Sequence, residues 1–263
     1  MELRVLLAIA VLVLLVRVAR VSWRHRRLSV AIWRAVRWHH LIGGAVLLVV
    51  VGSTALALVA FVPGADLGLG RLIGTSVNVV FTPLEEGLAL AGPPSATGPD
   101  WALIVGASGF LAPLALLLPW LAFIEEELFR AGLETASWPE VAPASLVFGA
   151  VHLLVLVPIG AAAAIGMAGF AYALAYRRAH REGRADRVPV VALRTYRPTR
   201  RSRTAAQAYR RTAVDTPGAV DADTSPELAQ ATGIFAAAVW HTTFNTMVVV
   251  VLWVSLVMSA FGR

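Results

Sequence analysis

Residues 102–130 read ALIVGASGFLAPLALLLPWLAFIEEELFR, an apolar run that ends in three consecutive glutamates and an arginine. A helix that crosses a bilayer needs about 20 mostly apolar residues. The part from Ala102 to Phe123 meets that length without a charged side chain. This stretch therefore indicates a membrane-spanning helix that carries ionisable groups to its end.

The composition of the whole chain agrees with a membrane protein. Hydrophobic residues make up 58% of the 263 residues and charged residues 15%, and the mean hydropathy is +0.71. A soluble domain averages about 25% charged residues, so the excess apolar surface requires a lipid solvent. The absence of cysteine excludes disulfides, thiolate metal ligands and a cysteine nucleophile.

Further apolar runs predict an all-α, polytopic membrane helix bundle with about six transmembrane helices. The expected spans are Leu3–Ala19, Leu41–Val62, Ala102–Phe123, Val141–Gly160, Ala161–Tyr176 and Ala231–Met258. A weaker apolar run at 72–90 contains Asn78, Pro83, Glu85 and Glu86. We interpret this run as a re-entrant or surface segment.

The positions of the arginines predict the topology, because cytoplasmic loops are enriched in basic residues. One cluster lies between the first two spans and another follows the fifth span; they comprise Arg17, Arg20, Arg24, Arg26, Arg27, Arg34 and Arg37, and Arg177, Arg178, Arg181, Arg184 and Arg187. Six spans place both clusters in the cytoplasm only if both termini are exterior. We expect a protein of the plasma membrane. Although the pI is about 11.1, we expect no nucleic-acid partner, since the arginines flank apolar runs.

Three regions follow from this pattern. Residues 1–100 form an N-terminal two-span region with an exterior loop. Residues 101–176 and 231–260 form a membrane core, which contains the unusual polar residues described below. Residues 177–230 are polar, first arginine-rich and then acidic, and they predict a mostly disordered cytoplasmic loop.

The first unusual polar group is the sequence from Glu125 to Arg130. Ionisable side chains within membrane spans are costly and are functional by default. Arg130 follows Glu126 by four residues and Glu127 by three, so a helix allows it to pair with either. Glu125 then lies about 100° away around the helix. The structural alternative is a charged cluster where a span ends at the membrane edge.

Two further polar groups lie in the fourth and sixth spans. Phe148 and His152 share one helix face, as do His241 and Asn245, because each pair is four residues apart. The structural alternative is that these side chains only form hydrogen bonds between helices. Counted from the expected cytoplasmic helix ends at 1.5 Å per residue, Glu125 lies at about 9 Å, His152 at about 14 Å and His241 at about 15 Å. These similar depths predict one shared polar site.

A carboxylate, two histidines and an amide support few reactions. A glutamate or histidine can deprotonate a water, and a second histidine with an asparagine can stabilise an oxyanion. Alternatively, Glu125, His152 and His241 could hold Zn²⁺ with one open position for water. Both arrangements lead to hydrolysis of a carbonyl compound. The sequence contains no HExxH motif and no nucleophile-elbow serine.

These motifs, in this order, resemble those of the CPBP family of intramembrane proteases, which includes the type II CAAX prenyl endopeptidases and the Abi-like proteins. The family's EExxxR motif matches Glu125, Glu126 and Arg130. Its FxxxH motif matches Phe148 and His152, and its HxxxN motif matches His241 and Asn245. The resemblance covers about Ala102–Met258, and the insert at 177–230 departs from it.

The resemblance implies a role for each matched residue. Glu125 and His152 would activate the water, and His241 and Asn245 would form the oxyanion hole. Glu126 and Arg130, with Phe148, would position these groups. Both metal-dependent and metal-free mechanisms have been described for the family. We favour a mechanism without a cofactor, and zinc is the alternative.

We therefore expect an intramembrane glutamate endopeptidase. Its substrate would be a membrane-embedded or lipidated protein, for example a prenylated CAAX-type protein, and its other partner is the lipid bilayer. One alternative is a non-catalytic scaffold or a maturation or immunity factor of the same fold. Another is a proton-coupled transporter, since intramembrane glutamate and histidine also serve in proton relays.

Overall fold

The computed structural model describes residues 3–68, 98–182 and 226–261. Within these ranges all regular elements are helical, and they are α1 (Leu3–Arg24), α2 (Arg26–Ala35), α3 (Trp38–Phe61), α6 (Trp101–Arg130), α7 (Trp138–Val151), the 3₁₀ helix η2 (His152–Val155), α8 (Ile159–Glu182) and α11 (Pro226–Phe261). Six helical segments are long and apolar enough to cross a membrane. This confirms the expected all-α membrane bundle. The proposed re-entrant segment at 72–90 lies outside the described residues.

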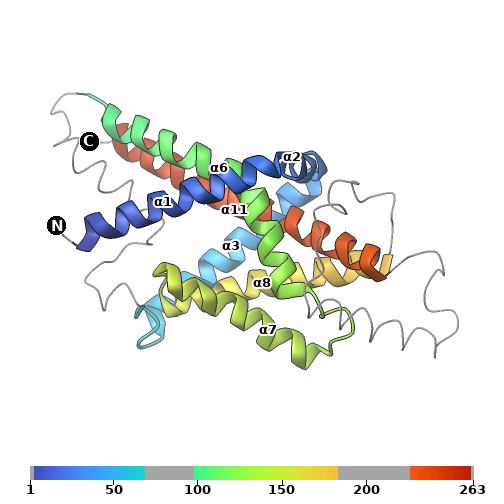
Figure 1. The fold of residues 1–263 in the computed structure, drawn as a ribbon. Helices are drawn as coiled ribbons and strands as arrows, with labels where there is room; N and C mark the ends of the chain where they lie inside the picture. Colours follow the sequence, from blue (N-terminus) through green and yellow to red (C-terminus); the bar gives the residue numbers. More distant parts are fainter. Residues whose placement is uncertain (1–2, 69–97, 183–225, 262–263) are drawn as a thin grey trace, which may run out of the picture.

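The two longest helices, α6 and α11, run antiparallel and side by side (Figure 1). Their pairing extends along both helices. The Asp100 amide donates to the Ala260 carbonyl at 3.0 Å, and the Trp253 indole donates to the Ser108 hydroxyl at 2.9 Å. Towards the other end of α6, Glu126 contacts His241 at 2.8 Å. This pairing brings the glutamates of the first motif against the third motif.

Helices α7 and α8 form a close antiparallel hairpin because small residues line their interface. A Cβ added at Gly149 would lie 2.2 Å from the Ala162 carbonyl oxygen and 2.7 Å from the Gly166 nitrogen. The predicted span from Val141 to Gly160 is present, but its predicted end is five residues too late. The helical segment ends at Val155, and Leu156 takes a left-handed conformation (φ 68°) before Pro158. Proline restricts the residue before it to extended backbone, which ends the helix.

Helix α3 packs against both α8 and α11. Glycines again permit the approach, since a Cβ at Gly43 would lie 2.5 Å from the Trp240 ring and one at Gly44 would lie 3.1 Å from the Met247 sulfur. The N-terminal region is therefore packed directly onto the membrane core.

The boundaries of the polar segments differ from those predicted. The basic stretch after α1 contains a short amphipathic helix, α2, which buries Leu28 and Ile32 and carries arginines on its other face. The predicted loop at 177–230 is helical at both ends, because α8 continues to Glu182 and α11 begins at Pro226. The remainder of that loop lies outside the described residues.

Backbone contacts join two pairs of chain segments at one end of the bundle. The start of α8 is bound to the chain after α3, since the amides of Ile159 and Gly160 donate to the carbonyls of Leu67 and Ala65 at 2.8 Å. The beginning of α6 is bound to the end of α11, and the start of α1 also lies towards this end (Figure 1). The basic ends of α1 and α8 consequently share the opposite end of the bundle.

Candidate active site

Glu126 is the centre of the polar cluster. One carboxylate oxygen accepts a hydrogen bond from Arg130 Nε at 2.7 Å, and the other contacts His241 Nδ1 at 2.8 Å. The side chains of Glu126 and Arg130 are fully buried, and His241 is 2% exposed. Of the two glutamates that the sequence allowed as partners of Arg130, the fold selects Glu126. A buried ion pair with this geometry holds the imidazole in one orientation.

Glu125 approaches the other side of the same imidazole. Its carboxylate lies 3.7 Å from His241 Nε2, and its side chain is 35% exposed. A carboxylate can only accept, so the contact with Glu126 places a proton on His241 Nδ1. In the neutral ring, the Nε2 lone pair would then face the Glu125 carboxylate.

His152 is positioned by the way in which α7 ends. Its backbone amide donates to Gly149 and Ala150 as the helix tightens into η2. The Phe148 carbonyl, which an α-helical bond from this amide would otherwise occupy, instead receives the His152 ring at Nδ1, 2.9 Å away. Because a carbonyl only accepts, Nδ1 carries the proton. The neutral His152 ring therefore keeps a lone pair on Nε2 that can accept a proton.

The Phe148 ring connects the two histidines. Its centroid lies 5.2 Å from that of His152 and 5.6 Å from that of His241, both in edge-to-face geometry. The Arg130 guanidinium carbon lies 4.8 Å above the ring. A Cβ at Gly169 would be 2.7 Å from the ring, so glycine on α8 gives Phe148 the space it occupies. The three motifs are thus joined through one buried aromatic ring.

Tyr172 on α8 belongs to the cluster and was missed in the sequence. Its ring stacks on His241 with centroids 4.6 Å apart and an interplanar angle of 17°. Its hydroxyl is buried and forms no hydrogen bond within the described part of the chain. The available signal was a tyrosine among the small residues of an otherwise apolar span. Tyr172 fixes the plane of the imidazole between the two glutamates.

The remaining expected residues lie nearby with fewer defined contacts. Asn245 is half-buried on α11, one turn after His241. The expected zinc ligands are Glu125, His152 and His241. In the described residues, no three His, Cys, Asp or Glu side chains converge closely enough to hold a metal ion. This arrangement does not fit a zinc site, and we derive no reaction step through a metal.

The depth calculation that predicted one shared site used incorrect helix ends. His152 lies fourteen residues into α7, or about 21 Å, and His241 lies fifteen residues into α11, or about 22 Å. Glu126 is only four residues, about 6 Å, from the end of α6. The motifs nevertheless meet, because α11 has 36 residues and extends beyond the end of its partner α6. The contacts, and not equal depth, define the cluster.

No protein-family model, curated protein or solved structure matches this chain.

Proposed function

We propose that the chain is an intramembrane endopeptidase that hydrolyses a peptide bond of a membrane-embedded or lipidated protein, as its resemblance to the CPBP family implies. One observation carries this proposal. Glu125 and Glu126, from one turn of α6, face the two ring nitrogens of His241 at 3.7 and 2.8 Å. A purely structural contact would need only one of these carboxylates.

The geometry suggests a separate role for each residue of the cluster. Glu126, neutralised by Arg130, holds His241 through Nδ1. A water in hydrogen-bond contact with both Glu125 and His241 Nε2 would form a triangle with bonds of about 2.8 Å on the 3.7 Å base. The Glu125 side chain is 35% exposed, whereas that of Glu126 is fully buried. Glu125 is therefore the carboxylate that a substrate and water can reach.

Hydrolysis then requires balanced proton transfers. Glu125, assisted by His152 Nε2, takes a proton from the water as its oxygen attacks the carbonyl carbon. The resulting oxyanion accepts hydrogen bonds from protonated His241 Nε2 and from the Asn245 amide. The C–N bond breaks as the proton passes to the leaving nitrogen, which yields a carboxylic acid and an amine. No cofactor is required for these steps.

We also propose the orientation of the chain. The basic end of the bundle carries α2, the end of α8 and the start of α11. Basic segments remain in the cytoplasm, so the chain termini are exterior and the cluster lies nearer the cytoplasmic face of the plasma membrane. A substrate would therefore enter from the cytoplasmic leaflet or from the cytoplasm.

Replacement of Glu125 tests the proposal. Membranes from cells that express either the full chain or Glu125→Gln are compared by mass spectrometry for newly formed protein termini. Loss of a general acid–base group lowers rates by about 10²- to 10⁴-fold. Termini made by the unaltered chain should therefore disappear in Glu125→Gln. A farnesylated CAAX peptide, tested on the purified chain, shows whether prenylated proteins belong to the substrates.

Glu127→Gln is the matched control. Glu127 lies two residues after Glu125 on the same helix and is also half-buried. The proposed mechanism does not use it. Membranes that contain Glu127→Gln should show the same newly formed protein termini as membranes that contain the unaltered chain. If the unaltered chain and Glu125→Gln yield the same termini at equal expression, the protein does not cleave membrane proteins, and a scaffold role would replace the proposal.

A further inference from the structure

A second polar feature lies apart from the glutamate–histidine cluster. It is a cavity of about 750 Å³ between the start of α3, the last turns of α8 and the first half of α11. Its volume falls within the range of about 300–1,000 Å³ that is typical of small-molecule sites. The residues that line it include Arg37, His39, His40, Arg178, Glu182 and Trp240. None of these takes part in the proposed reaction.

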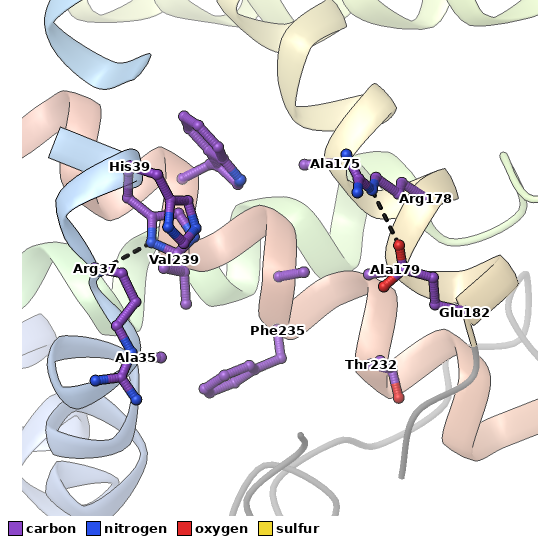
Figure 2. Close-up of a pocket in the computed structure, with 13 residues that line it drawn as sticks. Ala35, Arg37, His39, Ala175, Arg178, Ala179, Glu182, Thr232, Phe235 and Val239 are labelled. Atoms are coloured by element: carbon purple, nitrogen blue, oxygen red, sulfur yellow. Dashed lines mark hydrogen bonds and ion pairs between the residues drawn. The ribbon is translucent and has the colours of Figure 1, made fainter. Parts of the chain in front are cut away.

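The charged side chains lie on opposite sides of the cavity. Figure 2 shows Arg37 at the start of α3 on one side of the cavity and Arg178 on α8 on the other. Glu182 is the acidic residue in the lining, and its carboxylate accepts from Arg178 Nε at 3.0 Å. Arg178 is 80% exposed, so its remaining N–H groups are open to a ligand. The lining thus has an excess of positive charge.

Apolar groups form the rest of the wall. Alanines from three elements line the cavity, namely Ala35, Ala179 and Ala236. Phe235 and Val239 complete this part of the wall (Figure 2). A site of this kind suits a ligand with one charged group and an apolar remainder. It would not attract a small, fully hydrated anion alone.

Trp240 gives the cavity a rigid side. Its ring packs edge-on against His40, with centroids 4.9 Å apart, and fills the space above Gly43. His40 in turn accepts a hydrogen bond from the Arg37 amide at Nδ1, 3.0 Å away. The backbone that carries Arg37 is therefore fixed relative to α11 before any ligand binds.

The proposed orientation would place the cavity near the lipid headgroups. It is bounded by the first residues of one spanning helix and the last turns of another, both at the basic end of the bundle. Basic pockets between membrane helices on the cytoplasmic side suit the headgroups of anionic lipids. An arginine guanidinium can bind a phosphate group through two parallel hydrogen bonds.

We propose that this cavity binds a phosphate ester, with the positive charge of Arg37 and Arg178 attracting the phosphate and the alanine-lined wall against the apolar remainder. An anionic phospholipid or a soluble phosphate ester could supply this chemistry. Either one would bridge α3, α8 and α11. This inference is independent of the proposed protease activity.

Native mass spectrometry of the full chain in detergent tests the proposal, with phosphatidylglycerol, phosphatidylcholine and glycerol 3-phosphate as probes. Phosphatidylglycerol should bind more tightly than phosphatidylcholine. Arg37→Gln and Arg178→Gln should each weaken its binding about fivefold, the effect of one arginine near a membrane surface. Arg181→Gln is the matched control, since Arg181 is an exposed arginine on α8 outside the cavity lining.

The outcomes separate the ligand sources. If glycerol 3-phosphate displaces the lipid at equal concentration, the ligand is a soluble phosphate ester; if it does not, the ligand is a lipid. Thermal unfolding in phosphatidylcholine shows whether each variant is folded. Ala236→Leu, which fills the cavity without changing charge, should also abolish selective binding. Equal phosphatidylglycerol binding by Arg37→Gln, Arg178→Gln, Arg181→Gln and the unaltered chain would overturn the proposal.

Discussion

Two carboxylates, the buried Glu126 and the half-buried Glu134, connect neighbouring helices at the basic end of the molecule, and they differ in how completely their surroundings are hydrogen-bonded. Glu134, between α6 and α7, accepts from the Tyr176 hydroxyl at 2.8 Å, from Gln230 Nε2 at 2.7 Å and from the Gly132 amide at 2.9 Å. Both of its oxygens are therefore occupied. This cluster ties α8 and α11 to the loop before α7.

The Glu126 cluster has the same kind of position but an incomplete set of partners. Both oxygens of Glu126 are bonded, yet Arg130 Nη1 and Nη2 and the Tyr172 hydroxyl are buried without a hydrogen bond in the described chain. Nearly all buried polar groups in folded proteins have a partner, and exceptions require an explanation. Glu125 beside them is accessible to solvent. The Glu134 carboxylate is fully hydrogen-bonded, as expected of a structural contact between helices. The Glu126 cluster contains buried donors that have no hydrogen-bond partner in the described chain and could bind a ligand.

The largest effect on stability is expected at Glu126. Glu126→Gln leaves the buried Arg130 guanidinium without its counter-charge, and breaking a buried ion pair in this way costs about 3–5 kcal/mol. We expect a loss of that size in the free energy of unfolding, measured by denaturant titration in detergent micelles. Activity should also fall, because His241 loses its orientation.

A double variant shows whether this loss comes from the unpaired charge. The double variant Glu126→Gln/Arg130→Met removes both charges. It should therefore be less destabilised than the single variant Glu126→Gln. If the two single losses simply add in the double variant, the two residues are not coupled, and the buried pair does not organise the site.

A smaller effect is expected at Glu134. Glu134→Gln keeps the shape of the side chain but replaces one accepting oxygen with a donor, which opposes either Tyr176 or Gln230. Loss of a hydrogen bond to a charged group costs about 1–3 kcal/mol. The free energy of unfolding should fall by that amount, while the turnover of folded protein should stay within about twofold, because a structural tie contributes nothing to the reaction. A decrease in turnover comparable to that of Glu125→Gln would show that the two clusters are not separate in function.

Much of this arrangement was predictable from the sequence, and the difference between the two clusters shows where prediction stops. Apolar length alone identified the six spans found in the described part of the chain, because a bilayer imposes one requirement on every helix that crosses it. The motifs predicted that Arg130 pairs with Glu126 or Glu127, but they did not predict the contact between Glu126 and His241. The Glu134 cluster did not stand out, since a lone glutamate in a loop is common and only the fold brings Tyr176 and Gln230 to it.

The end of α7 was mispredicted for a related reason. Hydropathy does not distinguish a continuous apolar helix from one that turns, so residues 156–160 were counted as part of a span. Pro158 was the available signal for the break. The break determines the position of His152, because the tightened last turn frees the Phe148 carbonyl that holds the His152 ring. The position of His152 therefore depends on the local backbone conformation, which the FxxxH motif does not specify.

The smallest expected effect separates the two clusters most directly, because it compares one hydroxyl in each. Tyr176→Phe removes the hydrogen bond to Glu134 and should cost about 0.6–1.7 kcal/mol, the range measured for hydrogen bonds in membrane proteins. Tyr172→Phe keeps the ring that stacks on His241 and removes only a hydroxyl that has no partner in the described chain. Its free energy of unfolding should stay within about 0.5 kcal/mol of the unaltered chain or rise, because an unsatisfied polar group is removed. Both values are measured in one detergent by thermal unfolding. If Tyr172→Phe loses as much stability as Tyr176→Phe, the Tyr172 hydroxyl is bonded in the folded protein, and the Glu126 cluster is as saturated as the Glu134 cluster.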